Sequence, residues 1–404
     1  MRILLVHNNY QVHGGAEVFY HEVGRVLAEH GHQVAYFSAE CEAAKSEWKS
    51  YFPKVASYSK GGLLFKIISF PRMVYNRPAK QAMARLIRDF KPDVIHVFAI
   101  YVQLTPSVLD AAGEAGIPVV MSCNDYKHIC PNYKLYHHDK ICEECRGGKY
   151  YRAIANRCCH NSIAYSVASS VEAYVHNWMN IYRKNVHTFL FASKFMASKT
   201  EEFWGQGVRK RMLRNPFDAR KHDVSNDVGK YALYFGRLVD EKGVRVLLEA
   251  AAIAPEVPLI VVGDGPDMEV LKKRAVEKGV GHVQLVGAKW GEELDQILRD
   301  CRFVIVPSLW HENFPYVILQ SFAVGKPVIG SNRGGIPELV EHGNRGLIYE
   351  VQDAAKLADA MRLLMTDADL AKRMGSSAKQ YADAEFNDER FYADLMEIYK
   401  GTRA

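Results

Sequence analysis

The sequence predicts an α/β protein made of two Rossmann-like doubly wound domains that face each other across a cleft. Three observations predict this fold class. The chain has 404 residues, which is too long for one typical hydrophobic core. Short apolar runs alternate with segments of helical periodicity, as in parallel α/β layers. A polar, turn-rich stretch at residues 215–230 lacks both patterns and divides the alternation into two halves.

Each half contains a series of predicted strands with helices between them. The strands of the first half lie at residues 3–7, 33–39, 93–99, 118–123 and 187–192. Those of the second half lie at residues 231–238, 258–265, 283–288, 303–308, 327–331 and 346–351. We therefore expect an N-terminal domain over residues 1–214 and a C-terminal domain over residues 215–387. A last helix at residues 388–404 is expected to pack back on the first domain.

The composition is that of an ordinary globular protein, with 48% hydrophobic and 24% charged residues. The net charge of +6 suits a phosphorylated ligand or an anionic membrane surface but is too small to indicate nucleic acid. The first apolar run is short and predicts a strand rather than a signal peptide. No apolar run approaches the length of a membrane span. We expect a cytoplasmic protein, at the inner face of the cell membrane, with reduced cysteines.

Two cations follow the first strand of the second half, in "FGRLVDEKG". Arg237 and Lys242 bracket a turn after Gly236. The arginine as a planar fork and the lysine as a point charge could clamp a diphosphate. The alternative interpretation is two solvated loop charges.

Glycines follow two further strands of this half. Gly263 lies in the turn of "VVGDGPD", which lacks the third glycine of a dinucleotide fingerprint. Gly334 and Gly335 precede a predicted helix in "SNRGGIPELV". The amino end of a helix is a ready anion site, so both segments are candidates for binding a phosphorylated ligand.

An acid stands between a strand and a helix in "HENFPYVILQSF". Glu312 follows the strand at residues 303–308, a helix begins near Phe314, and Pro315 suits its first turn. Backbone amides there can hold phosphate, and the carboxylate can accept hydrogen bonds from sugar hydroxyls. Gln320 lies two turns later on the same helix. The alternative is that Glu312 only caps the helix.

Several motifs together resemble a known family. "FGRLVDEKG", "VVGDGPD", "LVGAKWGEEL" and the run from His311 to Val340 resemble the C-terminal domain of the retaining glycosyltransferases of family four, which adopt the GT-B fold. "GGAE" at residues 14–17 and "NDYKHICPN" at residues 124–132 resemble the matching N-terminal domain, in a cysteine-containing subtype. The resemblance covers nearly the whole chain in the family's order.

The resemblance implies roles for the residues of the second half. Arg237 and Lys242 match the basic pair that stabilises the diphosphate leaving group. Glu312 matches the first glutamate of the family's Glu-x7-Glu motif, which holds hydroxyls of the donor sugar. The amides of Asn313 and Phe314 would contact sugar and phosphate.

Other positions that the resemblance covers depart from the family's motif or belong to the first half. Gln320 replaces the second glutamate, which usually holds the ribose. Gly14 and Gly15 match a loop that reaches over the donor. Asn124 stands where many relatives have a histidine near the anomeric carbon, and Asp125 follows it. Asp125 is also the alternative nucleophile for a double displacement.

The resemblance implies a metal-independent retaining glycosyltransferase. It would move a sugar from a nucleotide-diphosphate sugar to a glycan or lipid-linked acceptor, in the synthesis of cell-surface polysaccharide or glycoconjugate. We expect no catalytic metal, because preorganised cations can stabilise the leaving phosphate. The alternatives are a nucleotide-sugar epimerase or sugar phosphorylase on the same fold, or an inactive nucleotide-sugar-binding subunit.

Cysteines cluster in an insertion at about residues 124–160. Cys130, Cys142, Cys145 and Cys158, with Cys159 as an alternative ligand, have a spacing close to that of zinc ribbons. Zinc there would be structural, since four protein ligands leave no open position. The alternative is a set of reduced cysteines in an irregular insertion.

A basic, apolar stretch at residues 61–80 contains Lys66, Arg72, Arg77 and Lys80. It predicts either an amphipathic element on anionic lipid or a packed helix that borders the acceptor cleft. A second basic run, at residues 207–215, lies on or beside a strand and is interpreted as a solvated face.

Overall fold

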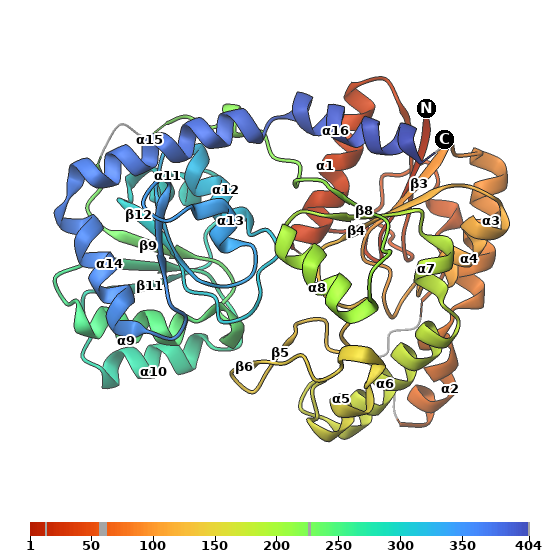
Figure 1. The fold of residues 1–404 in the computed structure, drawn as a ribbon, viewed down its shortest axis with the longest axis horizontal. Helices are drawn as coiled ribbons and strands as arrows, with labels where there is room; N and C mark the ends of the chain where they lie inside the picture. The colour runs from red at the N-terminus through yellow and green to blue at the C-terminus, as the bar shows by residue number, and fades with distance from the viewer. Residues whose placement is uncertain (13, 56–62, 225–227, 403–404) are drawn as a thin grey trace. The chain divides into compact units, whose positions relative to one another are not determined.

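The computed structural model describes residues 1–12, 14–55, 63–224 and 228–402, with residues 63–68 described by their backbone alone. The chain forms two compact units (Figure 1). Unit 1 comprises Met1–Leu135, Glu143–Pro216 and Asp388–Ala404, and unit 2 comprises Tyr136–Cys142 and Phe217–Asn387. Residues 136–142, which we expected in the N-terminal domain, thus belong to unit 2.

Unit 1 is built on a sheet of six parallel strands in the order β2-β1-β3-β4-β7-β8. The five strands predicted for the first half are present, with ends that differ from the predicted ranges by up to two residues, and β8 is an edge strand in the basic run at residues 207–215. The strands are β1 (Arg2–Val6), β2 (Gln33–Phe37), β3 (Val94–Val97), β4 (Val119–Cys123), β7 (Thr188–Phe191) and β8 (Lys210–Met212). β3 and β4 are buried throughout, as expected of strands covered on both faces.

Helices cover the sheet of unit 1. They are α1 (Gly15–Glu29), α2 (Leu63–Val74), α3 (Arg77–Phe90), α4 (Ser107–Glu114), α5 (Tyr151–Ala155), α6 (Ile163–Trp178), α7 (Ile181–Asn185), α8 (Lys194–Trp204) and α16 (Asp388–Gly401), with 3₁₀ turns η1 (Lys49–Tyr51) and η2 (Arg146–Gly148). The start of α3 illustrates how the sequence sets a boundary. The Asn76 side chain accepts a hydrogen bond from the Ala79 amide at 3.1 Å, and Pro78 lies in the first turn. Both are standard signals for a helix start.

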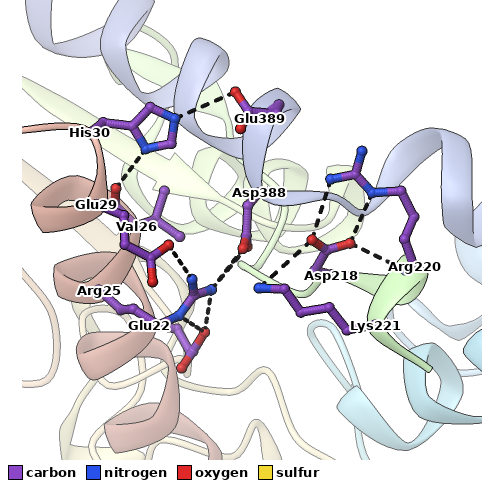
Figure 2. A network of polar contacts seen from close by, with 10 residues as sticks. All are labelled: Glu22, Arg25, Val26, Glu29, His30, Asp218, Arg220, Lys221, Asp388 and Glu389. Atoms are coloured by element: carbon purple, nitrogen blue, oxygen red, sulfur yellow. Dashed lines mark hydrogen bonds and ion pairs between the residues drawn. The ribbon is translucent and has the colours of Figure 1, made fainter.

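Helix α16 docks on α1 in unit 1. The Arg25 guanidinium donates two hydrogen bonds to the Asp388 carboxylate, each 3.0 Å long (Figure 2). The His30 ring stacks on the Tyr392 ring, with 3.7 Å between the ring centres. Leu395 and Tyr399 of α16 are fully buried in an apolar cluster with residues of α1 and of the sheet. The apolar side chains on one face of α16 (residues 388–401) therefore hold the end of the chain on unit 1.

Unit 2 contains a second sheet of six parallel strands, in the order β11-β10-β9-β12-β13-β14. All six predicted strands are present. They are β9 (Ala232–Phe235), β10 (Leu259–Val262), β11 (Val283–Gly287), β12 (Phe303–Val306), β13 (Val328–Ser331) and β14 (Gly346–Tyr349). Numbered within the unit, this is the 3-2-1-4-5-6 order of dinucleotide-binding folds. The order reverses between β9 and β12, and ligands of such sheets bind at the carboxyl ends of the strands at that place.

The helices of unit 2 alternate with its strands. They are α9 (Val244–Ile253), α10 (Met268–Glu277), α11 (Gly291–Asp300), α12 (Tyr316–Ala323), α13 (Ile336–Val340), α14 (Ala354–Thr366) and α15 (Ala368–Glu385), with 3₁₀ turns η3 (Ala219–Lys221) and η4 (Asp240–Lys242). The stretch expected to be a linker contains η3. Asp218 caps η3 by accepting from the Arg220 amide at 3.2 Å and from the Arg220 Nε at 3.0 Å (Figure 2). The cysteine-rich insertion contributes a short antiparallel hairpin to this unit, β5 (Tyr136–His137) and β6 (Lys140–Ile141).

The hairpin is fastened to η4 and α9. The Tyr136 hydroxyl donates to Asp240 Oδ2 at 2.9 Å, and the Arg245 guanidinium donates to Asp139 Oδ1 at 3.0 Å. The Tyr136 ring also packs in an apolar cluster with Val246 and Leu309. These contacts explain why residues 136–142 belong to unit 2.

The basic stretch at residues 61–80 forms α2 and the beginning of α3. Residues 61–62 and the side chain of Lys66 lie outside the described residues. Arg72, Arg77 and Lys80 line a pocket on unit 1. Within the part of the chain that the structure describes, no helix is both long and apolar enough to cross a membrane.

Candidate functional site

The predicted residues of the second half lie at the carboxyl edge of the unit 2 sheet. Gly236 and Arg237 follow β9, Gly263 follows β10, Glu312 follows β12 and Gly334 follows β13. Since β9 and β12 flank the reversal in strand order, the loops that follow them form the expected ligand site of this fold.

Lys242 and Glu312 form an ion pair at this edge. Lys242 Nζ lies 2.6 Å from Glu312 Oε1, and the Ser308 hydroxyl donates to the same oxygen at 2.7 Å. Lys242 Nζ also lies 5.6 Å from the centre of the Trp310 ring, within the range of a cation–π contact. Lys242 and Glu312 are 70 positions apart in the sequence, and the fold brings their charges into contact.

Glu312 is 5% exposed. Burial by itself would raise the pKa of its carboxyl group, but the nearby Lys242 ammonium and the hydrogen bond from Ser308 lower that pKa below its ordinary value. Glu312 is therefore ionised at neutral pH although it is buried. A buried charge of this kind requires a partner, and Lys242 provides it.

Gly334 and Gly335 hold the backbone of Glu312. Gly334 has φ 57°, and a Cβ atom there would lie 2.1 Å from the Glu312 carbonyl oxygen. The Gly335 amide donates to that same carbonyl at 2.7 Å. The amide that we expected to face an anion is therefore engaged with the protein, because the close approach of the two segments brings it to the Glu312 carbonyl.

Gly236 and Gly263 bring the loops after β9 and β10 together. Gly263 has φ 148°, and a Cβ atom there would lie 1.8 Å from the Gly236 carbonyl oxygen. The Tyr234 hydroxyl donates to the Arg237 carbonyl at 2.8 Å and fixes the turn. The Arg237 side chain itself is exposed, which leaves its guanidinium accessible to a ligand.

The remaining predicted residues of unit 2 surround α12. Asn313 and Phe314 are buried just before this helix, which begins after Pro315, and Gln320 is half-buried within it. Sequence reasoning missed Ser308 and Trp310 as neighbours of the ion pair. Their position directly after the strand at residues 303–308 was the signal that could have found them.

The other predicted residues lie in unit 1, also at carboxyl ends of strands. Gly14 and Gly15 stand at the start of α1, in the segment that follows β1, and Asn124 and Asp125 follow β4. Loss of solvent around the carboxyl group raises the pKa of Asp125 to about 6. The Lys127 amide donates to Asp125 Oδ1 at 2.9 Å and orients it. Asp125 can therefore hold or release a proton near neutral pH.

Glu17 is a further polar group of this region that sequence reasoning did not single out. It is buried, and its carboxylate accepts a hydrogen bond from Asn9 Nδ2 at 3.1 Å. His7, at the end of β1, is buried as well. The "GGAE" motif was the signal for Glu17, whereas nothing in the sequence distinguished His7 from a core residue.

The candidate zinc ligands are divided between the two units. Cys142 belongs to unit 2, and Cys130, Cys145, Cys158 and Cys159 belong to unit 1. Over the described residues, no three His, Cys, Asp or Glu side chains are grouped so that they could hold a metal ion. In this arrangement the cysteines do not fit a zinc site, and the zinc hypothesis rests on their spacing in the sequence.

Comparisons with known proteins agree with this architecture. The family described as "Glycosyltransferase Family 4" matches residues 13–221, and "Glycosyl transferases group 1" matches residues 217–381. Anabaena HepE in complex with UDP has a similar structure, with a TM-score of 0.70 and 17% sequence identity over 99% of this chain and 100% of that one. This likeness shows the fold, which is GT-B.

Curated relatives match over shorter segments. An uncharacterized glycosyltransferase of Methanocaldococcus jannaschii is 28% identical over 194 residues, covering 48% of this chain and 52% of that protein. The GDP-mannose-dependent alpha-(1-6)-phosphatidylinositol monomannoside mannosyltransferase of Mycobacterium tuberculosis is 33% identical over 233 residues, covering 53% and 59%. The chain thus spans about half the length of these curated relatives. Since one family profile covers more than half of its residues and a second covers residues 217–381, the chain belongs to glycosyltransferase family 4.

Proposed function

We propose that this protein is a retaining glycosyltransferase that uses a nucleotide-diphosphate sugar. The observation that carries the proposal is the ion pair between Lys242 and the buried Glu312 at the reversal of strand order in unit 2. A diphosphate bound there meets a cation, and a sugar bound there meets a carboxylate that remains ionised. Proteins that act on or bind nucleotide sugars, such as the GDP-mannose-dependent enzyme and HepE in complex with UDP-glucose, support this assignment.

The cations would act on the leaving group. As the bond between the anomeric carbon and the phosphate lengthens, negative charge accumulates on the diphosphate. Arg237 and Lys242 follow the same strand and could neutralise that charge, since charges fixed before reaction stabilise the transition state without reorganising. We therefore propose that catalysis requires no divalent metal.

Glu312 would hold the donor sugar. Its carboxylate already accepts hydrogen bonds from Lys242 and Ser308 through Oε1, and a carboxylate has further acceptor sites for sugar hydroxyls. Gln320 would bind the ribose, as an amide that can both donate and accept. Retention would follow if the acceptor hydroxyl attacks from the face that the diphosphate leaves, with the leaving phosphate as base. Asn124 and Asp125 are proposed to act near the sugar.

The acceptor is proposed to be a glycan or a lipid-linked sugar, for cell-surface polysaccharide or glycoconjugate synthesis. The phosphatidylinositol mannoside enzyme among the relatives supports a lipid-linked acceptor. The exposed basic side chains Arg72 and Arg77 on α2 and α3 support contact of unit 1 with an anionic membrane, which would place the protein at the inner face of the cell membrane.

The test is a thermal-shift screen against UDP-, GDP- and ADP-sugars, followed by turnover of the best donor with and without EDTA. We expect stabilisation by one nucleotide class and turnover that persists in EDTA. Lys242→Ala should mainly lower kcat, because its contact strengthens as charge builds on the leaving phosphate. Lys272→Ala, an exposed lysine paired with Glu269 on α10, is the matched control. Loss of turnover in EDTA that magnesium restores would contradict metal independence. Consumption of donor without an acceptor would instead indicate an epimerase or a hydrolase.

A further inference from the structure

Helix α6 of unit 1 has a polar buried face and an apolar exposed face. A helix on the surface of a globular protein normally shows the reverse pattern. The helix packs against α2, α5 and α7, and the side chains that it buries are Ser166, Ser170, Glu172 and His176. Its apolar face therefore requires an explanation outside the packing of unit 1.

The exposed face carries five apolar side chains, which we call the α6 stripe. Successive members lie three or four residues apart in the sequence, so they follow one side of the helix. Trp178 is 84% exposed and Ile163 is 52% exposed, and the other three are between 37% and 40% exposed. The members of the stripe are Ile163, Val167, Val171, Tyr174 and Trp178.

Hydrogen bonds prevent α6 from rotating to bury the stripe. The Lys127 ammonium lies 2.8 Å from Glu172 Oε2 in a buried ion pair, and His176 Nε2 is bonded to the Val74 carbonyl at 2.6 Å. The Ser170 hydroxyl donates to the Tyr150 carbonyl at 2.9 Å. A rotation would break all three contacts and leave buried polar groups unpaired, which is costly. The α6 stripe is thus held outward by the fold.

The exposed face of α6 also carries no charge. Over Ile163–Trp178, Glu172 is the only Asp, Glu, Lys or Arg, and it is buried. A helix that lies in a membrane interface normally has cations along its polar face, and α6 has none. A protein of different sequence is usually selected by complementary charges, and α6 offers none to select by. Both observations favour a partner surface that is itself uncharged and apolar.

We propose that the α6 stripe is the contact surface of a homodimer, in which the stripes of two copies pack on each other across a twofold axis. In a closed dimer the same patch serves both copies. An uncharged apolar stripe therefore meets its own copy without repulsion between like charges. The centre of such an interface is depleted of charged residues and enriched in aromatic ones, as is the α6 stripe with Tyr174 and Trp178.

The size of the stripe agrees with this assignment. An aromatic side chain has about 150–250 Å² of surface, so the exposed parts of Trp178 and Tyr174 amount to roughly 300 Å². With its three aliphatic members the stripe exposes on the order of 500 Å² per copy, and two copies would bury roughly 1,000 Å², the lower limit for a specific interface. Apolar patches of this size on a single chain commonly mark a contact surface.

Sedimentation velocity of the full chain at rising concentration tests the proposal. We expect a dimer whose share grows with concentration. Trp178→Ala should weaken the dimer about tenfold or more, because large aromatic side chains dominate such contacts. Val171 lies at the middle of the stripe and so next to its own copy across the axis. Val171→Lys and Val171→Glu should each weaken the dimer about a hundredfold or more, because like charges then face each other. Val276→Lys is the matched control, since Val276 is 82% exposed on α10 of unit 2.

Mixing the two Val171 variants separates loss of contact from loss of folding. An equimolar mixture of Val171→Lys and Val171→Glu should recover the dimer, because opposite charges then meet across the axis, whereas mixing cannot rescue a misfolded chain. Three results would each overturn the proposal: a parent chain that stays monomeric up to about 100 µM, a mixture that stays monomeric, or equal weakening by Val276→Lys and Val171→Lys. A monomeric chain that binds uncharged phosphatidylcholine vesicles, and loses that binding in Trp178→Ala, would also overturn it, because the stripe would then serve lipid.

Discussion

At the scale of single residues, Glu312 combines burial with charge. A buried carboxylate without a partner would take up a proton, but Lys242 and Ser308 keep Glu312 ionised. Removing one member of a buried pair costs far more than removing an exposed charge. Lys242 and Glu312 are therefore coupled, and a variant of either also changes the state of the other.

Glu312 and Gln320 should separate sugar binding from nucleotide binding. Glu312→Gln keeps the shape but loses the charge, and a hydrogen bond to a charged group contributes about 1.5–3 kcal/mol. Transfer should fall by about one to two orders of magnitude, while affinity for the nucleoside diphosphate barely changes. Gln320→Ala should weaken the free nucleotide and the intact donor alike. Calorimetric titration of the Glu312→Ala and Gln320→Ala variants with the nucleoside diphosphate checks the assignment, and the reverse pattern would contradict it.

Asp125 should make stability depend on pH. Its pKa of about 6 in the folded chain lies above the ordinary value of about 3.9, so folding favours the protonated form. The stability from this group is complete below pH 4 and is lost as pH rises through 6, a loss of up to about 3 kcal/mol by pH 8. Asp125→Asn should therefore melt at a higher temperature than the parent at pH 8, and the difference should vanish near pH 4. An equal difference at both pH values would show another cause.

The residues of the ion pair could be predicted from sequence, because each follows a strand that apolar periodicity reveals. The role of Gly335 could not be predicted from sequence. Its amide is expected to face an anion when only the local glycine–helix pattern is considered, but the fold places it against the Glu312 carbonyl. Such contacts depend on how two loops approach each other, and no local pattern encodes that distance.

At the scale of elements, the hairpin β5–β6 supports the turn that carries Lys242. Its Tyr136 hydroxyl bonds Asp240, the first residue of η4, and Lys242 is the last residue of the same turn. Sequence reasoning placed these residues in the other domain. Two-residue strands have no detectable period, and their partners lie about one hundred residues further along the chain.

Tyr136→Phe should loosen η4 without disturbing the apolar cluster around the ring. Loss of one hydrogen bond to a carboxylate at a half-buried position should reduce the stability of unit 2 by about 1 kcal/mol. Turnover should fall several-fold, because Lys242 loses its fixed position. Tyr231→Phe is the control, since the Tyr231 hydroxyl bonds the Ile297 carbonyl at 2.8 Å in the same unit and does not contact η4. Equal losses of turnover in both variants would assign the effect to unit 2 as a whole.

At the scale of the whole molecule, both predicted sheets are present, and the last helix packs on the first unit as predicted. The sequence predicts these features because apolar residues recur at regular spacing over long segments. The cysteine-rich insertion is where prediction from sequence was weakest. Its spacing indicates zinc, whereas the structure divides the five cysteines between two units and groups no metal ligands among its described residues.

Elemental analysis decides the zinc hypothesis. If the spacing reflects a ribbon-like site, freshly purified, untagged protein should contain about one zinc per chain, and Cys142→Ser should lower thermal stability more than nucleotide affinity. Cys301→Ser, a buried cysteine of unit 2 far from the insertion in sequence, is the control for zinc content. Stable, active protein without zinc would refute the hypothesis.

The division of the chain has a consequence for its synthesis. The backbone passes between the units four times, at residues 135–136, 142–143, 216–217 and 387–388. On the ribosome, domains usually fold in the order in which they emerge, but here the hairpin must wait for η4, and unit 1 must wait for α16. Until residues 388–401 appear, the part of the unit 1 core that shares a cluster with Leu395 and Tyr399 is open to water. Unit 1 emerges first but is completed last, so the nascent chain presents an apolar surface to chaperones throughout the synthesis of unit 2.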